Sequence, residues 1–153
     1  MLGPRVVLLV VAVVVLASGC GGSTVASVPE LESAVVLARD RTDYVLARIT
    51  RAESEGDFLE RMDEAADAID DAARDLDRIG VSKDRESEVG DLVESLHQLA
   101  FDVQATADQI REPGFGDLLT GTRGLSFESW SKVNLALAVL RKEGIEVAPL
   151  ERH

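Results

Sequence analysis

The chain has 153 residues, of which 16 are basic and 28 acidic, so its formal net charge is −12 at neutral pH. Such a chain is not expected to bind nucleic acid or to lie flat on anionic lipid, because both need basic surface. Its length allows one domain with a hydrophobic core, and its single cysteine allows no intrachain disulfide.

The first 20 residues have the organisation of a secretory signal segment. Arg5 supplies a positive charge, Val6–Leu16 is an uninterrupted apolar run, and the small residues Ala17-Ser18-Gly19 precede Cys20. A cysteine directly after the cleavage site resembles the lipobox of bacterial lipoproteins. The resemblance implies that residues 1–19 are a signal peptide, cut before Cys20, and that the thiol of Cys20 carries a diacylglyceryl group. Two acyl chains anchor a protein stably, so the expected location is the outer face of the cell membrane.

Two other interpretations of this segment remain open. An ordinary secretory signal would leave Cys20 as an incidental thiol, and an uncleaved segment would itself hold the chain in the membrane. The second fits poorly, because Val6–Leu16 has eleven residues and a helix needs about 20 to cross the hydrocarbon core.

Cleavage before Cys20 leaves 134 residues with a net charge of −13, because Arg5 is removed with the signal. Residues 20–28 then form the lipidated cysteine and a short tether. The small residues 21–26 reach at most about 20 Å, so the folded domain is expected to lie close to the membrane.

Three long amphipathic helices are predicted after the tether. Ser27 and Glu30 have the spacing of a capping box, with Pro29 in the first turn. Apolar residues then alternate at spacings of four and three, which places them along one face of a helix. This pattern covers three segments: Leu31–Ala52, Phe58–Ile79 and Val89–Ile110.

Capping and helix-breaking residues predict where these helices begin and end. Asp57 with Glu60 can form a second capping box, and Gly80 can end the second helix. Ser82 with Asp84 can begin the third helix, which Pro113-Gly114 ends.

A shorter fourth helix is predicted from Ser126, as its cap, to Gly144. Its inner face carries Phe127, Trp130, Val133, Leu137 and Leu140. The sequence therefore predicts an all-α, up-down four-helix bundle over residues 29–145, with three long helices of about 23–28 residues. Residues 146–153 are predicted to be a C-terminal tail, with a few extended residues at 145–150.

Two local patterns suggest metal binding but fit it badly. Glu94 and His97 have the Glu-x-x-His spacing of ferritin-like di-iron bundles, which need two such pairs, whereas this chain has one. We expect His97 at the solvent edge of the core. Residues 75–86 superficially fit a calcium loop, but Ile79 and Lys83 occupy ligand positions, so Gly80 is better explained as a helix stop.

The second helix is strongly acidic and is expected to be a solvated face with i,i+4 pairs such as Asp70 with Arg74. Its alternative role is to bind a basic partner or divalent cations. The glycine-rich loop 113–125 offers another candidate, a ligand or partner surface formed by Phe115, Arg123 and Trp130. The alternative is that Trp130 is plain core and Phe115 anchors the loop.

No catalytic set is recognisable, since His97 would be the only base away from the chain end, so we expect no enzyme activity, cofactor or metal. The leading hypothesis is a membrane-anchored extracytoplasmic lipoprotein that acts as a non-catalytic helical interaction module. Its partners would be the membrane, through the lipid on Cys20, and an envelope protein. The alternative is a lipoprotein that binds a small molecule or divalent metal through the 113–125 loop or the acidic second helix.

Overall fold

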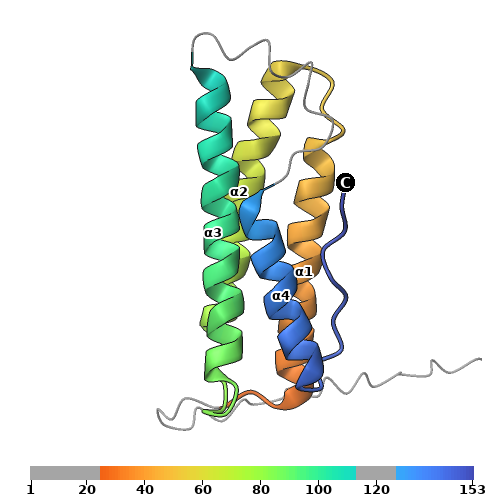
Figure 1. Cartoon of the computed structure of the whole chain (residues 1–153), viewed down its shortest axis with the longest axis vertical. Coiled ribbons are helices and arrows are strands. Elements are labelled where there is room, and N and C mark those ends of the chain that lie inside the picture. The colour runs from red at the N-terminus through yellow and green to blue at the C-terminus, as the bar shows by residue number, and fades with distance from the viewer. Residues whose placement is uncertain (1–24, 113–126) are drawn as a thin grey trace, which may run out of the picture.

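The computed structural model of the chain describes residues 25–112 and 127–153. These ranges contain four helices: α1 (Val28–Ile49), α2 (Glu55–Asp77), α3 (Glu86–Arg111) and α4 (Glu128–Lys142). Consecutive helices run in opposite directions and pack as neighbours, α1 on α2, α2 on α3 and α3 on α4 (Figure 1). The predicted all-α, up-down bundle with three long helices and one shorter one is therefore confirmed.

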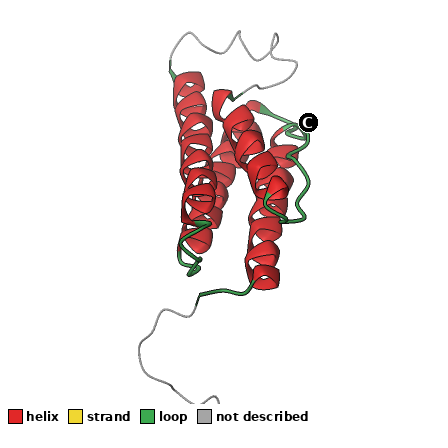
Figure 2. Cartoon of the chain, turned by 60° about the horizontal axis from the view of Figure 1, so that its bottom comes forward, coloured by secondary structure: helices red, strands yellow, loops and turns green. Residues whose placement is uncertain are grey.

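The bundle core consists of the apolar stripes that face inward from all four helices. Leu31, Val35 and Ile49 of α1 are buried, as are Met62, Ile69 and Leu76 of α2, Leu92, Leu96 and Leu99 of α3, and Leu137 and Leu140 of α4. These side chains follow the predicted spacing. Only helices and loops occur within the described ranges (Figure 2).

The start of α1 is the capping box that the sequence predicts. The backbone N–H of Ser27 donates to Glu30 Oε2 at 2.7 Å, and the Ser27 hydroxyl donates to the same oxygen at 2.8 Å. These hydrogen bonds lower the pKa of Glu30. The short segment before the helix is also held, because the Ala26 N–H donates to the carbonyl of Gly80 at 2.7 Å.

The predicted start of α2 is wrong by three residues. Ser54, rather than Asp57, is the N-cap, and its hydroxyl accepts from the Asp57 N–H at 3.1 Å. The Asp57 carboxylate accepts from the Glu53 N–H at 2.8 Å, one residue before the N-cap. The N-cap therefore lies three residues earlier than predicted, and the reciprocal bond of a capping box is not formed with the N-cap residue itself.

The connection between α2 and α3 is longer than predicted. α2 ends at Asp77, before Gly80, and α3 begins at Glu86, after Asp84. Ser82 and Asp84 form the preceding turn, in which the Arg85 N–H donates to the Ser82 carbonyl at 2.9 Å. A hydrogen bond from the Ser82 hydroxyl lowers the pKa of Asp84. The polar side chains thus stabilise a turn rather than the helix start itself.

α4 receives its N-terminal cap from another helix. Phe127 occupies its N-cap position, without a side-chain cap, and the predicted cap Ser126 lies outside the described residues. Instead, Asp102 of α3 accepts hydrogen bonds from the backbone N–H and hydroxyl of Ser129. The carboxylate satisfies an otherwise free N–H and lies at the positive end of the α4 dipole.

Gly144 ends α4, as predicted, and reverses the chain direction. Its φ is +87°, and the N–H groups of Gly144 and Ile145 donate to the carbonyls of Arg141 and Leu140. This is a Schellman motif, in which glycine avoids the steric penalty of a left-handed residue.

The C-terminal tail, residues 146–153, packs against α1 and α4 and belongs to the core. Val147 and Leu150 are buried. Glu32 of α1 accepts from the Glu146 N–H at 2.9 Å, and Asn134 of α4 accepts from the Leu150 N–H at 2.7 Å. The extended tail thereby runs alongside α1 (Figure 1) and is bonded to both the first and the last helix.

Candidate partner-binding surface

The predicted surface of Phe115, Arg123 and Trp130 is represented here only by Trp130. Phe115 and Arg123 lie outside the described residues, as does Cys20. Trp130 is partly buried against the core, and the guanidinium of Arg152 from the tail lies 5.0 Å from the centre of its ring. This cation–π contact shows that Trp130 packs against the tail as well as the core.

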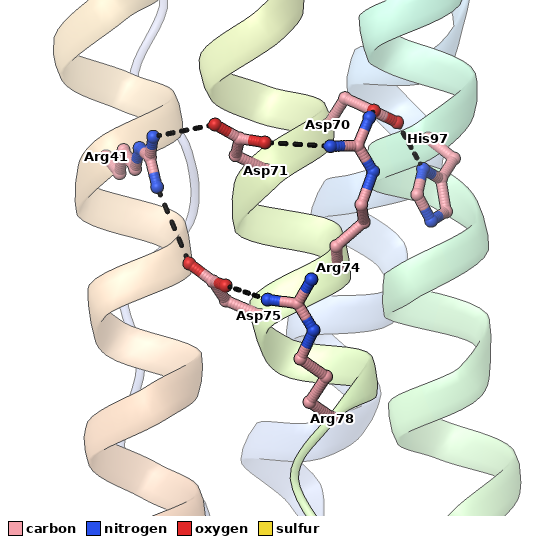
Figure 3. Close-up of polar contacts among 7 residues, drawn as sticks. All are labelled: Arg41, Asp70, Asp71, Arg74, Asp75, Arg78 and His97. Atoms are coloured by element: carbon pink, nitrogen blue, oxygen red, sulfur yellow. Dashed lines mark hydrogen bonds and ion pairs between the residues drawn. The ribbon is translucent and has the colours of Figure 1, made fainter.

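The acidic face of α2 is extensively paired with arginines (Figure 3). Arg41 of α1 lies 3.5 Å from Asp71 and 3.7 Å from Asp75, and Arg74 pairs with both Asp70 and Asp71. Further pairs join Arg61 with Asp57, Arg111 with Asp63, Arg48 with Glu64 and Arg78 with Asp75. The predicted Asp70–Arg74 pair is confirmed. Six of the ten acidic side chains of α2 take part in salt bridges within the described chain, whereas Glu55, Glu60, Asp67 and Asp77 do not.

His97 lies at the solvent edge, as predicted. Its side chain is 41% exposed and its Nδ1 lies 2.6 Å from Asp70 Oδ1, which links α3 to α2 (Figure 3). Glu94 lies on another side of α3, facing α4. The Glu-x-x-His pair therefore does not converge on one site.

A groove with exposed apolar side chains lies between α3 and α4. Its volume is about 310 Å³, and α4 contributes Lys132, Leu135, Ala136 and Val139. Leu135 is 68% exposed and Val139 is also exposed. Large apolar side chains exposed beside a groove are typical of interaction sites.

The α3 side of the groove is acidic and polar. It carries Glu88, Asp91, Glu94, Ser95 and Gln98. No salt bridge joins Glu88, Asp91 or Glu94 to any basic side chain within the described ranges. In addition, Glu88 Oε2 is buried and has no hydrogen-bond partner. This carboxylate side contrasts with α2, whose acidic groups are mostly compensated.

Sequence reasoning missed the groove, although a signal was present. Leu135 and Val139 are four residues apart, so they lie on the same side of a helix. They fall outside the inner stripe of Val133, Leu137 and Leu140, which the packing of α4 buries. An apolar pair outside the core stripe could therefore have indicated a second apolar surface on α4.

A group of three possible metal ligands occurs where α1 meets the tail. Asp43, Glu151 and His153 each offer an atom within 4.8 Å of the others, and no other such group occurs among the described residues. The Asp43 carboxylate already accepts from the Glu151 N–H at 2.7 Å and lies 3.8 Å from Arg39. A cation there would compete with that guanidinium.

These features define a class of protein: an acidic four-helix bundle, closed by its own tail, with an open groove on its α3–α4 side. No protein-family model matches the chain, and no curated protein or solved structure is significantly similar to it. In residues 25–112 and 127–153, none of the helices has the length and apolar character needed to span a membrane.

Proposed function

We propose that this protein is a membrane-anchored extracytoplasmic lipoprotein whose helical bundle binds a partner protein without catalysing a reaction. The groove between α3 and α4 carries the proposal, because it exposes Leu135 and Val139 beside carboxylates that form no ion pair within residues 25–112 and 127–153. A lipid on Cys20 would supply the anchor, and the partner would be another envelope protein.

The position of the first described residues supports a defined orientation. α1 begins at the end of the bundle that also holds the α2–α3 connection, and the Ala26–Gly80 hydrogen bond fixes this proximity (Figure 1). With six residues between Cys20 and Ser27, a lipid on Cys20 would keep this end near the bilayer. The groove would then face sideways, along the length of the bundle, where a partner can approach it.

Membrane fractionation of cells that express the wild type or Cys20→Ser tests the anchor. We expect the wild type to partition with the membrane and the variant to be released or to retain an uncleaved signal. A fully processed variant that remained membrane-bound would contradict lipid anchoring.

Crosslinking in the same cells tests the interaction. A photoreactive residue at position 135 should give a discrete crosslinked product, whereas the same residue at position 37 should not. Leu37 is a matched control, because it is 69% exposed on α1, away from the groove. Equal products at both positions would contradict a role for the groove.

The second candidate function is divalent-cation binding, which the cluster of Asp43, Glu151 and His153 favours over the acidic face of α2. Imidazole and carboxylate groups suit Zn²⁺. Titration with Zn²⁺, followed by thermal unfolding, should raise the Tm of the wild type but not of His153→Ala if this function is correct. An unchanged Tm in the wild type would remove it.

A further inference from the structure

We propose that the α3–α4 groove binds a basic amphipathic α-helix of the partner protein, an inference that rests on the proposed function and specifies its partner. The helix would place apolar side chains on Leu135, Ala136 and Val139 and direct lysines or arginines toward the α3 side of the groove. Amphipathic helices commonly bind in this way, with their apolar face in a groove.

The apolar floor of the groove accounts for the apolar face expected on the partner helix. Leu135 and Val139 are one turn apart on α4, and both are exposed in the isolated chain. Covering these two side chains would remove apolar surface from water without any change in the bundle core. Ala136 between them is 6% exposed and forms the bottom of the groove.

The acidic α3 side of the groove accounts for the basic side chains expected on the partner helix. Glu88, Asp91 and Glu94 follow one another at intervals of three residues on α3, so they form a row beside the groove. Asp91 and Glu94 are exposed, so lysines or arginines of the partner can pair with them directly. Glu88 Oε2 is buried without a hydrogen-bond partner among the described residues, and its carboxylate would have to turn outward to join them. Lys132 is the only basic residue that lines the groove, and it lies toward the far end from Glu88.

The size of the groove sets the length of the helix. Its α3 residues extend from Glu88 to Gln98, ten residues apart, which corresponds to about 15 Å along the helix axis. A partner helix of about three turns covers this distance. Leu37 and Tyr44 on α1 are also exposed, but they are not among the residues that line this groove.

The direct test uses a synthetic peptide as the probe. The peptide would be a stapled helix of about 14 residues with leucines on one face and lysines on the other. A fluorescent label reports its binding to the full chain in non-ionic detergent through anisotropy. We expect saturable binding that weakens as salt is raised. A peptide with glutamates in place of the lysines should not bind, and equal binding of both peptides would overturn the inference.

Matched variants locate the binding site. Glu88→Gln/Asp91→Asn/Glu94→Gln should weaken peptide binding about tenfold or more, because it removes the row of carboxylates. The control Glu60→Gln/Asp67→Asn/Asp77→Asn removes the same charge from exposed α2 residues that form no salt bridge within the described chain. It should change binding less than about twofold. If both triple variants lose the same peptide affinity, the attraction is a general effect of charge, and the groove is refuted as the binding site.

Three further variants keep the test decisive. Leu135→Ser should weaken peptide binding, whereas Leu37→Ser, at an equally exposed position on α1, should not. If the triple variant is unfolded by circular dichroism, Asp91→Asn/Glu94→Gln tests the same row with exposed residues only. If the folded double variant and the separate Leu135→Ser variant both bind the peptide as tightly as the wild type does, the inference is overturned.

The outcomes also separate this inference from the proposed function. Failure of the peptide to bind, combined with a specific cellular crosslink from position 135, would reject the basic helix but retain the interaction module. If the peptide binds but position 135 gives no cellular crosslink, the proposed function is rejected, and only the affinity of the groove for basic helices remains.

Discussion

The cap that α3 supplies to α4 leads to a quantitative prediction for Asp102→Ala. Asp102 Oδ2 accepts from the Ser129 N–H at 3.2 Å and from the Ser129 hydroxyl, while Oδ1 accepts from Gln98 Nε2 at 3.0 Å. Ser129 is only 1% exposed, so water cannot easily replace the lost acceptor. The variant should therefore destabilise the junction between α3 and α4.

The magnitude follows from the groups left without a partner. A buried polar group that loses its hydrogen-bond partner costs about 1–3 kcal/mol, and loss of a helix cap costs about 0.5–2 kcal/mol. Since the same hydrogen bonds contribute to both values, we expect a total of about 2–3 kcal/mol. At about 4 °C per kcal/mol for a domain of this size, the Tm should fall by about 8–12 °C.

The ionisation of Asp102 gives this prediction a pH dependence. Burial raises its pKa, but hydrogen bonds from Ser129 and Gln98 together outweigh burial and hold the pKa below its ordinary value. A lowered folded-state pKa stabilises the fold above the unfolded-state pKa of about 3.9, and this stabilisation is lost as the pH falls through the folded-state pKa. The stability difference between wild type and Asp102→Asn should thus be constant near neutral pH and shrink below about pH 4.

Urea and thermal unfolding, followed by circular dichroism, measure these differences. Asp108→Ala on the same helix is the control, because Asp108 is exposed and forms only surface contacts with Gln104 and Arg111; its cost should be below about 1 kcal/mol. The losses from Asp102→Ala and Ser129→Ala should be non-additive by about 1 kcal/mol. Additive losses, or an Asp102→Ala cost no greater than that of the control, would refute the proposed cap.

Three further predictions test other features of the bundle. Leu150→Ala should lower the free energy of unfolding in urea by about 2–4 kcal/mol, because Leu150 is buried; a loss below about 1 kcal/mol would contradict a packed tail. Gly144→Ala should destabilise the fold by about 1–2 kcal/mol at φ +87°, whereas Gly90→Ala, with open space on α3, should stabilise it by about 0.5–1 kcal/mol. If calorimetry shows that Gly144→Ala and Gly90→Ala shift the Tm in the same direction, this contrast is refuted. Arg41→Ala should cost at most about 1 kcal/mol, and this cost should decrease at high salt, because its ion pairs are partly exposed.

Local sequence signals predicted helix existence better than helix boundaries. The spacing of Ser27 and Glu30 specified the start of α1, because both hydrogen-bonding groups lie within four residues. At α2 the predicted cap, Asp57 with Glu60, is wrong, because Ser54 is the N-cap and its hydroxyl accepts from the Asp57 N–H. A serine three residues before the predicted cap is an equally suitable N-cap residue, so the spacing alone did not specify the helix start.

The candidate site was much less predictable than the core. Leu135 and Val139 share a side of α4, but their exposure depends on the position of α4 against α3. Likewise, the acidic α2 was a candidate cation site until the structure placed arginines from α1 and α3, such as Arg41 and Arg111, against it. Pairing across helices cannot be read from the spacing within either helix.

The sequence by itself determined the helical class, the inward stripes and the helix stop at Gly144, because these depend on residues within a few turns of one another. Only the tertiary structure decided that the tail runs alongside α1 and is bonded to both α1 and α4. It also decided that Asp102 caps α4 and that Glu88, Asp91 and Glu94 line a groove without a salt-bridge partner in the described part of the chain. Those features join residues that are distant in the chain, so their physical basis exists only after the helices have packed.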